Sequence, residues 1–299
     1  MSAADGTTAW ATIQRVILPS ADQPDTVSLY ADAGTASGIR LRENDELART
    51  PKLPEDKLQM FSSGSQQAHF EDLLTRHSMR VRSGEQISFG TYFNAFAASY
   101  WRRWTSVRDI RLVVRTSGTG TVTVYKSNAR GSVQRVDGVH VDGDSTSVFE
   151  LSLKPFGDGG WYWFDLAASA DGLVLESAQW ETAATGRPKG QVTLEITTMN
   201  KPDFCLNNAR ILADNPDVLE NVKEILIVDQ GTQKVEDQEG FAAVRDALGG
   251  KLRIINQANL GGSGGFARGM FEAVENGSDY ALLLDDDIVV EPESIVRLL

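Results

Sequence analysis

The feature that most constrains the fold is a regular alternation of strand-like and helix-like patterns in residues 190–299. Apolar runs of strand length occur at residues 192–197, 224–228, 252–255 and 280–284. Helical patterns lie between them at residues 203–213, 238–248 and 264–275, and Asp203 takes the N-cap position of the first. This alternation predicts a parallel sheet that is covered by helices on both faces. Ligands of such sheets bind at the carboxyl ends of the strands.

Residues 1–185 follow another pattern, in which short strands are separated by Gly, Asp and Ser turns. Strands are predicted at residues 110–116, 121–125, 148–153, 161–166 and 173–180, and their spacing predicts a β-sandwich or jelly roll. The polar stretch 31–83 is interpreted as a long loop or insertion, with a short helix at residues 67–77. A linker-like segment at residues 185–190 separates two predicted domains, 1–185 and 190–299.

The composition limits the classes of partner. The net charge of −12 argues against general nucleic-acid binding, which needs a concentrated basic surface. The single cysteine, Cys205, excludes an internal disulfide, and no segment of the sequence has the length and apolarity of a membrane span. The basic-aromatic cluster at residues 100–104 (YWRRW) is interpreted as a packed edge or an interface in preference to a platform for sugars or bases.

The most informative chemical motif is the apolar run 282–284 followed by Asp285, Asp286 and Asp287. Side chains alternate along a strand, so Asp285 and Asp287 are expected to point the same way and to share one hard cation. Mg²⁺ or Mn²⁺ held by one or two carboxylates characteristically bridges to phosphate. An alternative is the D-x-D-x-[TV] motif of haloacid-dehalogenase-type phosphatases. That motif ends the first strand of its domain, whereas three strands precede this one.

A glycine-rich turn, residues 259–265 (NLGGSGG), leads from the third strand of the predicted sheet into a helix. Glycines let the backbone approach a ligand, and the start of the helix offers unpaired N–H groups to an anion. Gly262, Gly264 and Ala267 also satisfy G-x-G-x-x-A, so a dinucleotide-binding fold stays an alternative. Two weaker candidates follow earlier strands: residues 229–231 (DQG) as a contact to base or ribose, and Lys201 as a contact to phosphate.

Together these motifs resemble the GT-A glycosyltransferases. More closely, the chain resembles the polymerising galactofuranosyltransferases of cell-wall galactan, which carry a β-sandwich ahead of the GT-A domain. The stretches that carry the resemblance are residues 15–19, 89–96, 99–104, 158–161, 229–231, 259–265, 285–288 and 291–292. They span nearly the whole chain, and the resemblance implies that residues 190–299 are the first part of a GT-A domain.

The resemblance implies UDP-galactofuranose as the donor and a growing, lipid-linked galactan chain as the acceptor, with inverting transfer in alternating β-1,5 and β-1,6 linkages. Carried over by position, the residues expected at the nucleotide sugar are Lys201, Asp229, Gln230, Asn259, Gly262 and Asp285. Asp285 and Asp287 are the expected ligands of Mn²⁺ or Mg²⁺. Lys201 stands where the family pattern has arginine, so the bidentate fork of a guanidinium is lost.

By the same resemblance, the general base and a metal-binding histidine are expected beyond Leu299. The 299 residues are therefore expected to be a fragment that does not polymerise and that exposes apolar surface on its sheet. The resemblance also implies a homotetramer at the cytoplasmic face of the membrane. Two other functions stay open: a non-catalytic module for glycan binding or oligomerisation, and a nicotinamide-dependent oxidoreductase built on the glycine loop.

Overall fold

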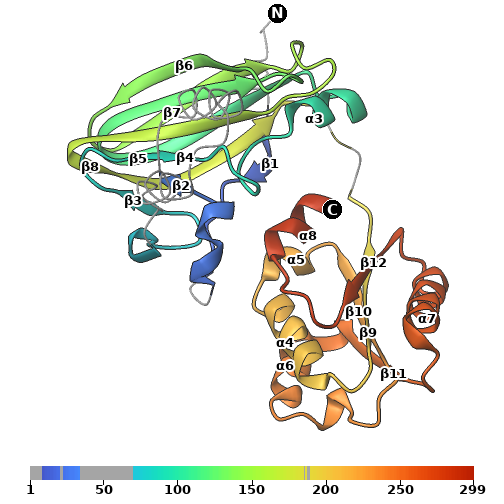
Figure 1. Ribbon diagram of the computed structural model, residues 1–299. Coiled ribbons are helices and arrows are strands. Elements are labelled where there is room, and N and C mark those ends of the chain that lie inside the picture. Colours follow the sequence, from blue (N-terminus) through green and yellow to red (C-terminus); the bar gives the residue numbers. More distant parts are fainter. Residues whose placement is uncertain (1–8, 21–22, 34–69, 185, 187–188) are drawn as a thin grey trace, which may run out of the picture. The chain divides into compact units, whose positions relative to one another are not determined.

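The computed structural model describes residues 9–20, 23–33, 70–184, 186 and 189–299. They belong to two compact units, Met1–Thr185 and Gly186–Leu299, which are described separately (Figure 1). In these described ranges, no helix combines the length and the apolar character that crossing a membrane requires.

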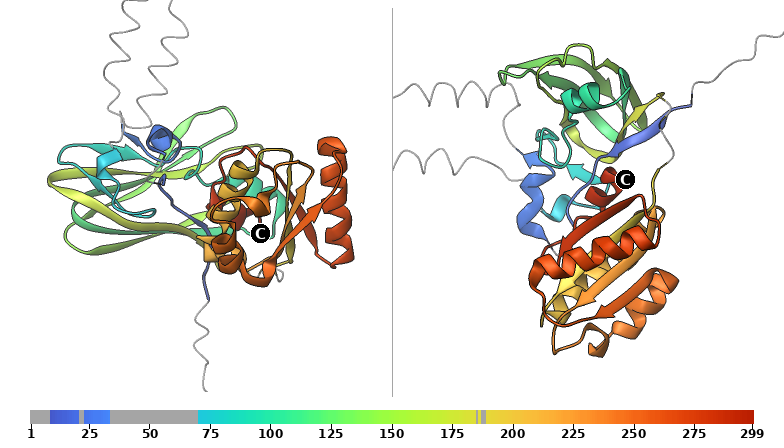
Figure 2. Two further views of the ribbon diagram at one scale, coloured as in Figure 1. Left: turned by 90° about the horizontal axis from the view of Figure 1, so that it is seen from below. Right: turned by 90° about the vertical axis from the view of Figure 1, so that its right-hand side faces the viewer.

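The N-terminal unit is built on two long antiparallel strands, β5 (Asp109–Ser127) and β8 (Tyr162–Thr182). They are paired from Arg111 and Glu181 at one end to Lys126 and Tyr162 at the other, and Figure 2 shows them running side by side. Each of them joins two strands that the sequence predicts as separate. The turn-like residues 117–120 do not end β5, because the register shifts there and Gly118, with φ of 94°, absorbs the irregularity.

Six shorter strands complete an eight-stranded antiparallel sheet. Three of them pair with β8: β1 (Ala11–Arg15), β3 (Met79–Val81) and β4 (Gln86–Ser88). β2 (Asp32–Ala33) pairs with β4, and the two halves of β5 pair with β7 (Ser145–Ser152) and β6 (Val133–Val141). A large antiparallel sheet is therefore confirmed, whereas the finer jelly-roll arrangement stays a prediction.

The range 31–83 holds more regular structure than a loop, because β2 and β3 lie near its ends. Residues 34–69 fall outside the described ranges. The helix predicted at residues 67–77 is wrong for the part that is described: a 3-10 helix, η2 (Phe70–Asp72), is followed by a turn. The Thr75 hydroxyl accepts hydrogen bonds from the backbone N–H groups of His77 and Ser78, and such side-chain bonds compete with helix formation.

Aromatic side chains form much of the core of this unit. Phe89 stacks on Phe164 with 4.6 Å between ring centroids, and Phe96 lies 5.2 Å from Trp180, which is fully buried. A 3-10 helix, η1 (Pro24–Leu29), and a short helix, α3 (Ala98–Trp104), flank the sheet. Within α3, Trp101 stacks on Phe96 as expected of a packed edge. The other two aromatic residues of α3, Tyr100 and Trp104, are exposed and so do not pack as expected.

The second unit contains a four-stranded parallel sheet, which confirms the prediction. Its order is β11 (Leu252–Asn256), β10 (Val222–Asp229), β9 (Val192–Thr198) and β12 (Tyr280–Asp285). β9, which is the first strand of this unit in sequence, lies between β10 and β12. Loops that are distant in sequence therefore meet at the carboxyl ends of neighbouring strands.

Helices lie on both faces of this sheet (Figure 1). The apolar face packs against α4 (Pro202–Ala213), α5 (Pro216–Leu219), α6 (Phe241–Leu248) and α8 (Pro292–Leu298). The other face is covered by α7 (Gly261–Glu275), which the right-hand view of Figure 2 shows in front of the strands. Two 3-10 helices, η3 (Val235–Asp237) and η4 (Gly249–Lys251), flank α6.

Three details of the helices differ from the sequence prediction. Asp203, which was predicted as the N-cap, lies in the first turn of α4, and the N-cap of this helix is Lys201. The helix predicted from residue 238 begins at Phe241, because Gly240 takes a left-handed conformation with φ of 86°. The third helix, α7, begins at Gly261 and so includes most of the glycine-rich turn. Exposed apolar side chains, which the sequence analysis expects of this sheet, include Tyr280 and Leu283 on β12.

Candidate functional site

Polar residues follow all four parallel strands at their carboxyl ends. β12 leads into Asp285–Asp287, β9 into Asn200 and Lys201, β10 into Gln230, and β11 into the glycine-rich turn. Hydrogen bonds between these loops show that they meet. They place the predicted residues at one edge of the sheet, so the convergence expected at the carboxyl ends of parallel strands is observed.

The three aspartates have different surroundings. Asp286 accepts a hydrogen bond from the Thr198 hydroxyl at 2.7 Å, and its carbonyl accepts one from the Asn208 amide of α4 at 2.9 Å. Asp287 accepts a hydrogen bond from the Lys201 ammonium at 2.6 Å. Asp285 is exposed and has no side-chain partner among the described residues. Asp286 is thus held by the fold, whereas Asp285 is free to bind a ligand.

Asp285 and Asp287 do not point the same way through strand alternation, which is a correction to the sequence analysis. β12 ends at Asp285, and residues 286 and 287 form a turn, so the alternation of a strand does not extend to Asp287. Its carboxylate is turned to Lys201, and both side chains are about half exposed. The Lys201 ammonium holds the pKa of the Asp287 carboxyl below its usual range. Lys201 and Asp287 therefore form a charged pair beside the free carboxylate.

Asp229 lies behind this edge of the sheet. Its side chain is fully buried and accepts hydrogen bonds from the N–H groups of Gly231 (2.8 Å) and Val235 (2.9 Å), with the Lys234 ammonium at 3.6 Å. Since both carboxylate oxygens are used, Asp229 fixes the loop after β10. A direct contact to a nucleotide would require this loop to rearrange.

Gln230 connects the loop after β10 to the glycine-rich turn. Its side-chain oxygen accepts a hydrogen bond from the Leu260 N–H at 2.8 Å, and its amide donates to the Gly261 carbonyl at 3.1 Å. The Asn259 side chain caps the same turn by accepting from the Gly261 N–H at 2.9 Å. Both predicted residues thus lie at the turn, where they hold the start of α7.

The glycines of the turn and of the helix that follows it occupy their positions for different structural reasons. Gly261 has φ of 69°, which favours glycine. A Cβ on Gly265 would lie 2.3 Å from Thr197, and one on Gly269 would lie 2.0 Å from Glu195. Gly262 has open space around it. A Cβ on Gly264 would lie 2.3 Å from the Leu260 side chain, so the fold also requires one glycine of the G-x-G-x-x-A pattern, and the glycines do not decide against the dinucleotide-binding alternative.

Sequence reasoning missed Asn200, which couples two of the loops. It is the one non-glycine residue with positive φ (53°) in the described ranges, and asparagine tolerates this conformation better than most residues. Its side-chain oxygen accepts hydrogen bonds from the N–H groups of Thr232 (2.8 Å) and Gln233 (3.1 Å). A Cβ on Gly231 would lie 2.6 Å from the Asn200 nitrogen. Residue 231 is therefore glycine because the loop after β9 approaches it too closely to leave room for a side chain.

Sequence reasoning also missed Glu195, which lies on β9 beneath α7. The side chain is fully buried, one oxygen accepts a hydrogen bond from the Thr197 hydroxyl at 2.6 Å, and the other has no partner among the described residues. Burial raises the pKa of the Glu195 carboxyl to about 7. Thr197 is paired in register with Asp285, so this polar pair adjoins the candidate site. A glutamate within an apolar strand run is the signal that could have revealed it.

The raised pKa of Glu195 predicts a fall in stability with increasing pH. Between its unfolded value near 4.5 and its folded value of about 7, the folded state binds more protons than the unfolded state, so the free energy of unfolding decreases. The loss amounts to about 3 kcal/mol by pH 8. Urea unfolding at several pH values measures it, and a Glu195→Gln variant, which keeps a neutral side chain, should lack this component. An equal pH dependence in the variant would contradict the assignment.

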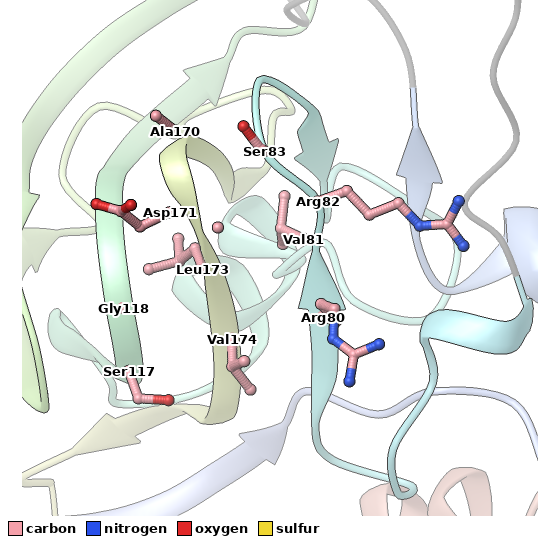
Figure 3. A pocket seen from close by; sticks show the side chains of 11 residues that line it. Arg80, Val81, Arg82, Ser83, Ser117, Gly118, Ala170, Asp171, Leu173 and Val174 are labelled. Carbon is pink, nitrogen blue, oxygen red and sulfur yellow. The ribbon is translucent and has the colours of Figure 1, made fainter.

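A hollow of about 420 Å³ lies in the N-terminal unit, beside β3 and the irregular parts of β5 and β8. Figure 3 shows the side chains of Arg80 and Arg82 extending away from Leu173 and Val174, so polar groups do not converge in it. Arg82 binds Asp72 at 2.8 Å. We assign no function to this hollow.

The chain resembles known proteins along its length. Residues 50–183 match the family "Galactofuranosyltransferase 2 N-terminal", and residues 188–299 match "Glycosyltransferase like family 2". The galactofuranosyltransferase GlfT2 of Mycolicibacterium smegmatis is 37% identical over 99% of this chain and 42% of that protein. GlfT2 of Mycobacterium tuberculosis is 38% identical over 96% of this chain and 41% of that protein. The chain thus spans about two-fifths of the length of these relatives.

Solved structures add little to this comparison. The PBSX exported protein XepA aligns with 38% of this chain and 36% of its own at 11% identity, with a TM-score of 0.26, a level that carries no argument about the fold. The sequence matches carry the assignment: the chain belongs to the galactofuranosyltransferase family, with an N-terminal unit of the galactofuranosyltransferase 2 kind followed by a glycosyltransferase unit of family 2 type.

Proposed function

We propose that the second unit binds UDP-galactofuranose and that the protein transfers galactofuranose to a growing, lipid-linked galactan chain. The observation that carries the proposal is the placement of Asp285, a carboxylate without a partner among the described residues, at the end of β12 and beside β9. The loop after β9 supplies Lys201, and the glycine-rich turn begins the helix that packs on β9. An anionic ligand thus has a cation and a helix start within one edge of the sheet.

The donor groups fit a hard divalent cation. Asp285 and Asp287 offer carboxylate oxygens, the ligand type that Mg²⁺ and Mn²⁺ prefer, and such ions keep several positions for water and phosphate. In the parts of the chain that the structure describes, no group of three His, Cys, Asp or Glu side chains could hold a metal ion. We therefore propose a site with two protein ligands from this chain. When bound, Mn²⁺ or Mg²⁺ would neutralise charge on the diphosphate and stabilise the departing UDP.

The residues of this chain bind and orient the donor in the proposal. Lys201 is paired with Asp287 in the structure; in the proposal the cation replaces it there, and its ammonium turns to a phosphate as a point charge in place of the fork of an arginine. Gln230, Asn259 and the backbone at Gly262 hold or form the turn that faces the nucleotide. Residues 190–299 contain no histidine, and by resemblance the general base is proposed to lie beyond Leu299. Inverting transfer in β-1,5 and β-1,6 linkages, a homotetramer and a position at the cytoplasmic face of the membrane are parts of the same proposal.

Ligand-induced stabilisation tests the nucleotide class. UDP with Mn²⁺, at one hundred times its dissociation constant, should raise the free energy of unfolding by about 2.7 kcal/mol. ADP and NADH at the same concentration should raise it less, because the proposal requires a uridine nucleotide. Thermal unfolding monitored by circular dichroism provides the measurement. Stabilisation by NADH without metal would favour the oxidoreductase alternative over a glycosyltransferase.

A further inference from the structure

The segment that joins β9 to α4 is only three residues long, Met199 to Lys201, and its backbone is constrained from both sides. Asn200 takes the left-handed conformation, with φ of 53°. Lys201 precedes Pro202, whose ring disfavours the helical conformation at the residue before it, and Lys201 has φ of −130° and ψ of 50°. The direction in which the Lys201 side chain leaves the backbone is therefore set by its two neighbours.

The Asn200 side chain holds this segment against the loop after β10. Its Oδ1 accepts hydrogen bonds from the Thr232 N–H at 2.8 Å, from the Thr232 hydroxyl at 3.2 Å and from the Gln233 N–H at 3.1 Å. The contact requires glycine at residue 231, because a Cβ there would lie 2.7 Å from the same oxygen. One amide oxygen thus joins two loops that are 32 to 33 residues apart in the sequence.

Lys201 brings a positive charge to the candidate site from this constrained segment. Its ammonium lies 2.6 Å from the Asp287 carboxylate and 6.0 Å from the centroid of the Phe204 ring. The side chain is 46% exposed, so the surrounding residues do not enclose it. A lysine side chain is a flexible stem that ends in a point charge, and the position of its backbone decides which points the charge can reach. The conformation at Asn200 therefore limits where the ammonium acts.

We propose that Asn200 is a positioning residue for the diphosphate of the nucleotide, on which it acts through Lys201. The inference rests on the proposed function, in which Lys201 leaves Asp287 to the metal ion and turns its ammonium to a phosphate. Because Asn200 holds the backbone during that exchange, only the side-chain torsions of Lys201 have to change. A group that is already placed loses less conformational entropy on binding, and this saving contributes to the affinity.

A double-mutant cycle, measured by calorimetric titration of UDP with Mn²⁺ into the 299-residue chain, tests this inference. Asn200→Ala removes the acceptor oxygen and disfavours the left-handed backbone, so it should lower the affinity about fivefold or more. Lys201→Met should lower it about tenfold or more, because it removes a hydrogen bond between charged groups. In the Lys201→Met background, Asn200→Ala should have a further effect of less than about twofold, because the residue through which it acts is absent.

Two other variants complete the experiment. Asn200→Gly permits the left-handed backbone and removes only the side chain, so it should fold, and its loss of affinity should show the same dependence on Lys201. The matched control is Asn215→Ala at the other end of α4, which removes a hydrogen bond of 2.7 Å to the Ile211 carbonyl. This control should bind UDP as the wild type does. Urea unfolding checks that each variant is folded.

The outcomes separate this inference from the proposed function. Equal fold losses from Asn200→Ala in the wild-type and Lys201→Met backgrounds would overturn the inference, because Asn200 would then act without Lys201. An unchanged affinity in both Asn200 variants would also overturn it, as would an equal loss in Asn215→Ala, which would indicate a general loosening of α4. In each of these cases, binding of UDP by the wild type would leave the proposed function intact. The absence of UDP binding by the wild type would contradict the proposed function and this inference with it.

Discussion

A Gly269→Ala variant is expected to lose about 3 kcal/mol of unfolding free energy. The added methyl group would lie 2.0 Å from Cγ and 2.5 Å from Cδ of Glu195. Glu195 cannot move away easily, because it is fully buried on the central strand and bonded to Thr197. The helix propensity of alanine recovers about 1 kcal/mol at most, so the clash decides the sign. Urea unfolding of both proteins measures the difference.

Two further variants show whether this contact is the cause. Gly262→Ala lies in the same helix with nothing within 4 Å of its added Cβ, so its unfolding free energy should stay within about 0.5 kcal/mol of the wild type or rise. Glu195→Ala should restore part of the loss when it is combined with Gly269→Ala, because it removes the atoms that collide. Equal destabilisation by both glycine variants would contradict the packing of α7 on β9.

An Asp285→Ala variant is expected to lose metal-dependent nucleotide binding while it keeps its fold. Asp285 has no side-chain bond to lose among the described residues, so its removal should leave the free energy of unfolding nearly unchanged. The proposed cation would keep only Asp287, and the affinity for UDP with Mn²⁺ should fall at least tenfold, as expected for the loss of one of two carboxylate ligands. Calorimetric titration of the variant provides the measurement.

Asp246→Ala is the matched control for this variant. Asp246 is an exposed carboxylate on α6 that lies 3.6 Å from Arg245, away from the carboxyl ends of the strands. The control variant should bind UDP as the wild type does. If Asp285→Ala also bound UDP with Mn²⁺ unchanged, Asp285 would not be a ligand of the cation.

The sequence predicts the elements of the second unit well because each one buries a continuous apolar pattern. The four parallel strands come from runs such as residues 224–228, whose side chains are nearly all buried. The strands of the N-terminal unit were harder to predict, because turn-like residues at 117–120 indicated a turn between two separate strands. Pairing with β8 along the whole length keeps β5 extended there. Strand β6, most of whose side chains are exposed, had no apolar pattern to reveal it.

The sequence predicted where the candidate residues lie, at one edge of the sheet, but not how their side chains are oriented. The edge of the sheet was expected because the strands are parallel and their carboxyl ends lie together, and the loops of Lys201, Gln230, Asn259 and Asp285 do meet there. The orientation of Asp287 was not predictable from alternation, because it depends on where β12 ends. The burial of Asp229 was also not predictable, because the sequence does not distinguish an aspartate that binds a ligand at a strand end from one that holds a loop.

The most direct test of the central claim is calorimetric titration of UDP into the 299-residue chain, with Mn²⁺ and then with EDTA. The account predicts binding with Mn²⁺ that EDTA abolishes, because the cation links the diphosphate to Asp285 and Asp287. Binding of UDP that is equally strong in EDTA would contradict the proposed metal site. The absence of any UDP binding with Mn²⁺ would contradict the claim that this edge of the sheet binds the donor.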